Sequence, residues 1–138
     1  MILLDTNIIS EMMKNTPDAN VIQWLDTQEV TELFITSITI AELSYGINSL
    51  PVGNRKQSLE TAFTNTVKEA FKHRILFFSD SAALFYGKIM SHRKKLGRPL
   101  SILDGQIAAI ALSQTATLAT RNIRDFSDCD LDLINPFH

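Results

Sequence analysis

Five short apolar runs alternate with helix-like segments, and this alternation constrains the fold more than any other feature of the sequence. The runs are residues 2–4, 33–36, 75–78, 117–120 and, more weakly, 131–134. Strands that are buried on both faces of a parallel sheet consist of such continuous runs, and the segments between them return the chain to the same edge. We therefore predict an α/β fold in which a parallel central sheet of about four to five strands is flanked by helices on both sides.

The intervals between the apolar runs carry helical spacing and cap residues. Helices are expected over residues 8–14, from 19 onward, 39–50, 55–71, 80–96 and 102–112. Neither an internal repeat nor a linker interrupts the pattern, and 138 residues suit one domain of ordinary size. Residues 1–138 are accordingly predicted to form a single domain.

The composition excludes several classes of protein. A chain of this length with 45% hydrophobic residues can bury a core without disulfide or metal staples. The single Cys129 has no internal partner, which fits a reducing compartment. No apolar run approaches the ~20 residues that span a bilayer, and the first residues lack a secretory pattern. We expect a cytoplasmic protein that does not associate with a membrane.

Common catalytic motifs are absent, but four carboxylates are placed to meet at one edge of the predicted sheet. Asp5 follows the first apolar run, and Glu42 lies one turn into the helix after the second. Asp104 opens the helix over 102–112, and Asp125 comes a few residues after the fourth run. Ligands of open parallel sheets bind beyond the carboxyl ends of the strands, so all four side chains can converge there.

Each carboxylate also has a purely structural interpretation. Asp5 could cap the helix that follows it, and Asp125 could be a turn residue. The stretch Thr39–Glu42 fits a capping box in which Glu42 reaches back to the Thr39 amide, and Ser101–Asp104 nearly fits the same template. Four carboxylates gathered at one edge would however repel one another unless they were protonated or bound to a cation. Oxygen ligands of this kind select Mg²⁺ or Mn²⁺, which suits metal-assisted hydrolysis of a phosphodiester.

Four sequence strings resemble those of the PIN-domain family. They are Leu4-Asp5-Thr6-Asn7, Ile40-Ala41-Glu42-Leu43, Asp104-Gly105-Gln106-Ile107-Ala108 and Thr120-Arg121-Asn122 to Asp125-Phe126. Their order and intervals resemble the VapC-like toxins of bacterial toxin–antitoxin pairs, and the closing Asn135-Pro136-Phe137-His138 is similar to the FitB-like branch. The resemblance covers nearly the whole chain and implies a single PIN-like nuclease domain.

The resemblance also implies roles for individual residues. It implies that Asp5, Glu42 and Asp104 are catalytic and hold Mg²⁺ or Mn²⁺. The fourth acid differs among relatives, some of which carry it at the position of Asn122 and others at that of Asp125. We assign the fourth catalytic and metal-binding role to Asp125 and a supporting hydrogen-bonding role to Asn122. The other supporting residues, expected to orient carboxylates or bound waters, are Thr6, Asn7 and Thr120.

Basic residues gather in the middle of the chain. Residues 51–100 hold ten bases and three acids, whereas residues 1–50 hold one base and seven acids. Such asymmetry can mark a surface that binds a polyanion, here RNA, although a solvated helix face is an equally plain interpretation. The candidate RNA-binding residues are Lys88, Arg93, Lys94, Lys95 and Arg98.

Together these features predict a metal-dependent endoribonuclease that serves as the toxin of a VapBC-type pair. The alternative is a FitB-like binding module, weakly catalytic or non-catalytic, that regulates transcription with a DNA-binding partner. The resemblance implies a small DNA-binding antitoxin, contact with operator DNA only through that antitoxin, and a homodimer. Apolar residues of the first helices could form a groove for the antitoxin, or they could pack internally or against a second copy. These residues are Ile8, Ile9, Met12, Met13 and Trp24.

Overall fold

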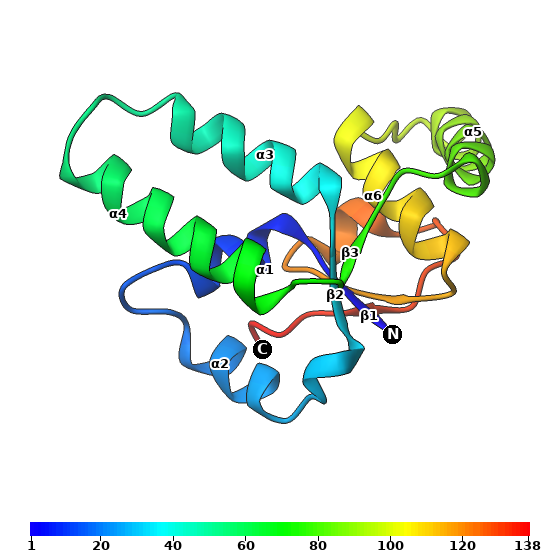
Figure 1. Ribbon diagram of the computed structural model, residues 1–138. Coiled ribbons are helices and arrows are strands. Elements are labelled where there is room, and N and C mark those ends of the chain that lie inside the picture. Colours follow the sequence, from blue (N-terminus) through cyan, green and yellow to red (C-terminus); the bar gives the residue numbers. More distant parts are fainter.

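One parallel sheet forms the centre of the molecule (Figure 1). The computed structural model describes residues 1–138. Its strands are β1 (Ile2–Leu4), β2 (Leu33–Thr36), β3 (Ile75–Leu76), β4 (Thr117–Ala119) and β5 (Leu133–Ile134). They form one sheet in the order β3-β2-β1-β4-β5, in which every pairing is parallel. The predicted fold class is thus confirmed, and each of the five apolar runs supplies a strand.

Helices connect successive strands. The α-helices are α1 (Thr6–Met12), α2 (Ala19–Asp26), α3 (Ser37–Asn48), α4 (Asn54–Phe63), α5 (Asp80–Lys95) and α6 (Ile102–Ser113). Shorter helical segments are η1 (Val30–Glu32), η2 (Thr64–Ala70) and η3 (Ile123–Phe126). The residues expected to form one helix over 55–71 are divided between α4 and η2, a π-helix that continues it. No helix combines the length and the apolar character that crossing a membrane requires.

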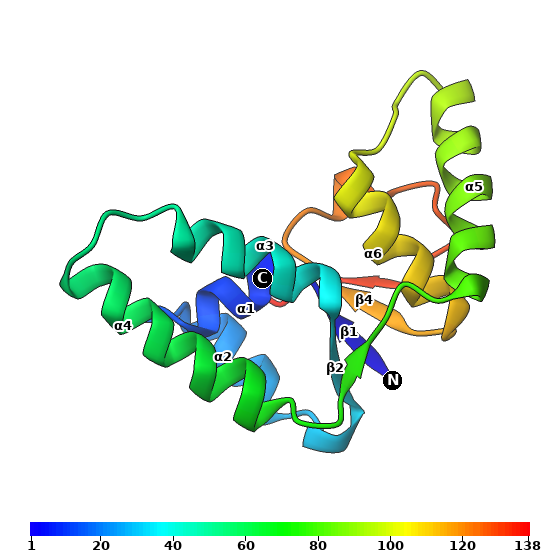
Figure 2. The same cartoon turned by 45° about the horizontal axis from the view of Figure 1, so that its top comes forward.

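The helices cover both faces of the sheet. Figure 2 shows α1 to α4 on one side of the strands and α5 with α6 on the other. Successive side chains of a strand point to opposite faces. Leu3 therefore packs into the cluster that includes α5 and α6, whereas Leu4 packs with Ile8 and Val21 of α1 and α2. Both leucines are completely buried, which explains why the strands are apolar throughout.

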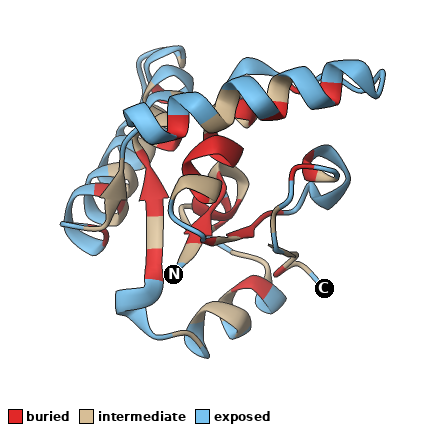
Figure 3. Ribbon diagram, turned by 90° about the vertical axis from the view of Figure 1, so that its right-hand side faces the viewer, coloured by how far each residue is buried: buried red, intermediate tan, exposed pale blue.

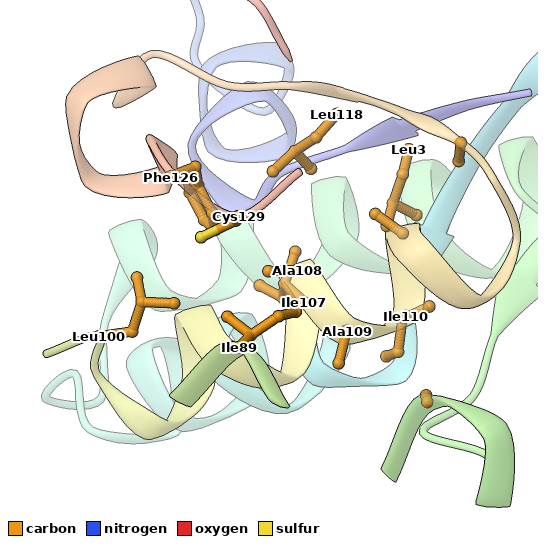
Figure 4. Packing of buried hydrophobic residues seen from close by; sticks show 13 residues of the cluster. Leu3, Ile89, Leu100, Ile107, Ala108, Ala109, Ile110, Leu118, Phe126 and Cys129 are labelled. Atoms are coloured by element: carbon orange, nitrogen blue, oxygen red, sulfur yellow. The ribbon is translucent and has the colours of Figure 1, made fainter. Parts of the chain in front are cut away.

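Helix α6 runs through the larger hydrophobic cluster (Figure 4). All five residues from Ile107 to Ala111 are buried, and three of them are alanines that allow close approach. At Gly105, a Cβ atom would lie 2.5 Å from Sδ of Met90 and 3.1 Å from the ring of Tyr86, so α5 and α6 touch where the side chain is missing. Figure 3 shows the buried residues gathered on the strands and the inward helix surfaces. The first turn of α6, which carries Asp104, is thereby fixed against α5.

Candidate active site

Asp5 lies directly after the central strand β1 and is 4% exposed. Its Oδ1 accepts the backbone N–H of Thr6 at 2.8 Å, so Asp5 is the N-cap of α1. Its Oδ2 accepts the hydroxyl of Thr120 at 2.7 Å and the side-chain amide of Asn7 at 3.2 Å. Capping and site formation therefore coexist in this residue, because its two oxygens face different partners.

Glu42 lies in α3, which begins earlier than the sequence predicted. Thr36, the last residue of β2, is the N-cap, and its hydroxyl oxygen accepts the backbone N–H of Thr39 at 3.0 Å. The alternative in which Thr39 and Glu42 form a capping box is therefore wrong, since Thr39 already lies inside the helix. The Glu42 carboxylate instead accepts the hydroxyl of Thr6 at 2.9 Å, which turns it toward the end of β1.

Three threonine hydroxyls form a chain that ends at Glu42. The hydroxyl of Thr36 donates to that of Thr39 at 3.4 Å. Because Thr6 donates its only hydroxyl proton to Glu42, the 2.9 Å contact between Thr39 and Thr6 has Thr39 as donor. The chain joins β2, α3 and α1, and it holds one oxygen of Glu42 in a fixed direction.

Asp104 lies in the first turn of α6. Ser101 is the N-cap of this helix, and its hydroxyl oxygen accepts the backbone N–H of Asp104 at 3.2 Å. The Ser101 half of the capping-box alternative is thus confirmed, whereas no hydrogen bond runs from the Ser101 N–H to the Asp104 carboxylate. The Asp104 side chain lines the same cavity as Asp5 and Glu42, although it comes from the opposite side of the sheet.

The cavity that these three carboxylates share has a volume of about 350 Å³ and no hydrophobic lining residue. Thr6, Asn7 and Asn122, all predicted from the sequence, line it too. The lining residues that the sequence prediction missed are Ser10, Glu11, Lys14 and Arg121. The first three repeat at helical spacing after Asn7, and Arg121 adjoins Asn122, so their positions in the sequence carried a signal.

Asp125 lies outside the main cavity. It is exposed on η3 and shares a smaller cavity, about 230 Å³, with Asp104 and Ser101. Asn122, in contrast, faces the main cavity, and its backbone N–H donates to Oγ1 of Thr120 at 3.0 Å. The structure therefore brings Asp125 close to Asp104 but does not bring it to Asp5 and Glu42.

Burial and repulsion by a neighbouring carboxylate raise the pKa of each of the three carboxylates in the main cavity. The pKa of Asp5 rises from 3.8 to about 6, chiefly because of burial. Hydrogen bonds from Thr120 and Thr6 lower this pKa, whereas the negative charges of Asp104 and Glu42 raise it further. Burial is also the main cause that raises the pKa of Glu42 and of Asp104. Repulsion by Asp104 adds to the rise at Glu42, and repulsion by Asp125 adds to that at Asp104.

The donor set of this cavity fits a small, hard cation. Carboxylate oxygens are the ligands that Mg²⁺ and Mn²⁺ prefer, and their mutual repulsion would be relieved by a bound positive charge. No three His, Cys, Asp or Glu side chains stand close enough together to surround an ion by themselves. An ion at this edge would therefore be bound directly by at most two carboxylates and would keep several waters, as Mg²⁺ usually does.

The bases that were predicted to bind RNA lie on α5 and just after it, and none of them lines the main cavity. Lys94 and Lys95 are exposed, and the ammonium of Lys88 lies 5.9 Å from the centre of the Phe85 ring. Arg98 forms an ion pair with Asp128.

Arg93 departs from the prediction. It is 4% exposed, and its guanidinium donates to the carbonyl oxygens of Arg98 at 2.8 Å, Asp125 at 2.7 Å and Ser127 at 3.0 Å. The predicted contact with RNA conflicts with this burial, because Nε and Nη1 already donate to acceptors inside the protein. Arg93 instead ties α5 to the segment that carries Asp125.

The apolar residues of the first helices are mostly used in the core. Ile8 and Ile9 are completely buried, and Met12, Met13 and Trp24 pack against the same cluster. This arrangement matches the internal-packing alternative. A groove of about 430 Å³ nevertheless lies between α1, α3 and α4, and it shares Thr6 and Glu42 with the acidic cavity. Its apolar lining consists of Met13, Leu43, Ile47, Leu50 and Leu59.

Comparison with known proteins agrees with this geometry. The family model described as PIN domain matches residues 2–130. The chain is 37% identical to the VapC ribonuclease Y4jK of Sinorhizobium fredii, covering 99% of this chain and 98% of the relative. It is 37% identical to toxin FitB of Neisseria gonorrhoeae, covering 100% and 99%. A solved structure of FitAB bound to an IR36 DNA fragment superposes with a TM-score of 0.92 at 36% identity, covering 100% of this chain and 96% of that one. On these grounds the chain belongs to the PIN-domain family.

Proposed function

We propose that the chain is a metal-dependent endoribonuclease that hydrolyses RNA phosphodiester bonds and acts as the toxin of a VapBC-type pair. The observation that carries the proposal is the wholly polar cavity in which Asp5, Glu42 and Asp104 meet with raised pKa values. The similarity to a named VapC ribonuclease and to a named toxin supports the reaction type. We place the activity in the cytoplasm, where the single free Cys129 stays reduced.

The proposed cofactor is Mg²⁺ or Mn²⁺, bound by Asp5, Glu42 and Asp104 in part through water molecules, since no three of these side chains are close enough to ligate it directly, with Asp125 as the fourth acid on the side of Asp104. When bound, such an ion activates a water molecule and neutralises charge that develops on the phosphate. The chain supplies fixed orientation: Asp5 is held by Thr120, and Glu42 is held by Thr6. A carboxylate of this set accepts the proton that the attacking water loses.

RNA outside the cavity is proposed to contact the exposed bases of the α5 region. Lys94 and Lys95 extend into solvent, and the exposed Lys88 and Arg98 lie on the same helix and just after it. Such cations bind phosphates without reading the bases, so they would contribute affinity rather than sequence preference. Arg93 is left out of this set because it is buried.

The proposed partner is a small DNA-binding antitoxin. The groove between α1, α3 and α4 offers an apolar floor for an amphipathic helix, and Glu42 connects it to the acidic cavity. An arginine or lysine of the antitoxin could then occupy the cavity in place of the metal. Operator DNA would be contacted only through the antitoxin; the similar FitAB pair was solved bound to a DNA fragment.

A homodimer is also proposed, because large apolar side chains remain exposed on one copy. Tyr45, Phe77, Leu84 and Ile102 are each more than 60% exposed. Where such side chains gather into one contiguous patch, they mark interaction sites in soluble proteins. Equilibrium sedimentation at several protein concentrations would report the stoichiometry, and a monomer at every concentration would contradict this part of the proposal.

The test of the nuclease is a cleavage assay on single-stranded RNA with Mg²⁺ or Mn²⁺, with and without EDTA. Asp104→Asn is expected to lower the rate by orders of magnitude, whereas the control Asp132→Asn, an exposed carboxylate without a side-chain hydrogen bond, is expected to leave it unchanged. Full activity in EDTA would contradict the metal mechanism. RNA or antitoxin binding without cleavage in any divalent ion would favour the alternative, a binding module that regulates transcription.

A further inference from the structure

Arg121 brings a cation without a partner to the acidic cavity. It follows Thr120 directly and lines the cavity together with Asp5 and Glu42. The three ion pairs of the structure join other residues, and the only hydrogen bond of Arg121 involves its backbone N–H. Its guanidinium is therefore free to donate to a ligand.

Lys14, the other cation that lines the cavity, differs in this respect. Its ammonium contacts Oε1 of Glu11 at 3.0 Å, and Glu11 is 6% exposed. The second oxygen of Glu11 accepts the backbone N–H of Asp18 at 3.1 Å, so this carboxylate is held in place. The charge of Lys14 is thus balanced inside the protein, whereas that of Arg121 is not.

The C-terminal segment holds Arg121 in position. The guanidinium carbon lies 4.5 Å from the centre of the Phe137 ring, within the range of a cation–π contact. Phe137 is itself fixed, because its N–H donates to Oδ1 of Asn135 at 3.0 Å and its carbonyl accepts the side chain of Asn20 at 3.1 Å. The backbone N–H of Arg121 donates to Oδ1 of Asn7 at 3.2 Å. The backbone of Arg121 and the face of its guanidinium are therefore held in place, and only the guanidinium N–H groups are left without hydrogen-bond acceptors.

We propose that Arg121, held against Phe137, binds a backbone phosphate of RNA at the edge of the acidic cavity, an inference that rests on the proposed nuclease function. An RNA phosphate is repelled by the carboxylates of this cavity, and a cation beside them offsets that repulsion. The planar guanidinium matches two phosphate oxygens, which a lysine cannot do. Phe137 acts through Arg121 as a positioning residue, which gives a role to the C-terminal Asn135-Pro136-Phe137-His138.

The experiment compares RNA cleavage by Arg121→Gln and Arg124→Gln in the full chain with Mg²⁺. Arg124 is also exposed and loses the same charge three residues away, but it does not line the cavity. Arg121→Gln is expected to raise KM about 10- to 100-fold, as befits the loss of a charge-assisted bond, and to change kcat less than about threefold. Arg124→Gln is expected to change KM by less than about threefold, since it loses only screened long-range attraction.

Two further variants test the role of Phe137. Phe137→Leu is expected to raise KM in the same direction as Arg121→Gln but less, and Phe137→Trp, which keeps an aromatic face, is expected to restore the wild-type value. A loss of thermal stability in Phe137→Leu without a change in KM would contradict the positioning role, because a merely structural residue would behave in that way.

RNA binding in an Asp104→Asn background separates this inference from the proposed function. The slope of log affinity against log salt is expected to fall by about 0.7 when Arg121 is replaced, the value for one phosphate contact on a single strand. Equal slopes and equal KM values for the Arg121 and Arg124 variants would overturn the inference while leaving the nuclease proposal intact. A wild-type chain that cleaves no RNA with Mg²⁺ or Mn²⁺ would overturn the nuclease proposal, and the binding slopes would still decide whether Arg121 contacts phosphate.

Discussion

Replacing Asp5 by asparagine tests the electrostatics of the cavity in the absence of metal. Asp5 is 4% exposed, and its pKa rises from 3.8 to about 6, chiefly because of burial. Since one pKa unit corresponds to about 1.4 kcal/mol, ionisation of this carboxylate lowers the free energy of unfolding by about 3 kcal/mol at pH 7.5. The folded chain holds the proton that the unfolded chain releases near its ordinary pKa. Stability therefore falls as pH rises from about 4, and the loss is complete above about 6.

Asparagine removes the charge but changes the hydrogen bonds. Its oxygen can still accept the Thr6 N–H, whereas its NH₂ group replaces the oxygen that accepts from Thr120 and Asn7. The Thr120 hydroxyl can rotate to accept a hydrogen bond from this NH₂ group, but the Asn7 amide then faces a second donor. The unpaired donors lower the free energy of unfolding by about 1–2 kcal/mol. We expect Asp5→Asn to be about 1–2 kcal/mol more stable than wild type at pH 7.5 and about 1 kcal/mol less stable at pH 4, where Asp5 is protonated.

Urea unfolding followed by circular dichroism in EDTA, from pH 4 to pH 8, measures both curves. Asp132→Asn is the control, because Asp132 is exposed and its side chain makes no hydrogen bond. Its curve is expected to run parallel to that of wild type. If the curve of Asp5→Asn also ran parallel to that of wild type, the raised pKa of Asp5 and the account of the cavity built on it would be refuted.

Three further predictions concern packing and hydrogen bonds. Gly105→Ala is expected to lower the unfolding free energy by about 1–2 kcal/mol, because its Cβ would press on the α5 side chains. Gly87→Ala, with open space around it, is the control and should raise the unfolding free energy by up to about 1 kcal/mol. Thermal denaturation distinguishes the two variants. Arg93→Met is expected to cost about 3 kcal/mol in urea unfolding, since three carbonyls lose their donor, and an unchanged midpoint would contradict this role. Thr39→Val is expected to slow RNA cleavage severalfold, because it removes the hydroxyl that donates to Thr6, which in turn donates to Glu42. A cleavage rate equal to that of wild type would show that this chain of hydroxyls does not position the Glu42 carboxylate.

Much of the fold could be predicted because strands that are buried on both faces of the sheet appear in the sequence as continuous apolar runs. Each apolar run became a strand, and the helix expected over residues 80–96 is α5, which begins at Asp80 after the N-cap Ser79. The start of α3 was missed because Thr39, with Glu42 three residues later, fits a capping box, whereas Thr36, the actual N-cap, has no acid at that distance. Only the pairing of Thr36 within β2 decides between them, and pairing depends on distant residues that local spacing does not reveal.

The acidic site was predicted unevenly for a similar reason. Asp5, Glu42 and Asp104 are attached to strands or to helices packed on strands, so topology alone brings them together. Asp125 lies on η3, a short helix whose last carbonyls accept hydrogen bonds from the buried Arg93, a long-range contact that sequence spacing does not reveal. The burial of Arg93 itself could have been foreseen, since it follows Ala82 and Ile89 at helical spacing and both of these are buried.

The order of strands in the sheet determines when during synthesis the site can form. β1 is made first yet occupies the centre, and the partner on one of its edges, β4, is made near the end of the chain. The hydrogen bond from Thr120 to Asp5 spans 115 residues. A ribosome-bound chain therefore contains Asp5, Glu42 and even Asp104 before β4, the strand that aligns them, has been synthesised. Contacts between residues so far apart in the sequence also form slowly. A truncated or unfinished chain is thus expected to be inactive, so the cell meets the nuclease only once translation has delivered its last strands.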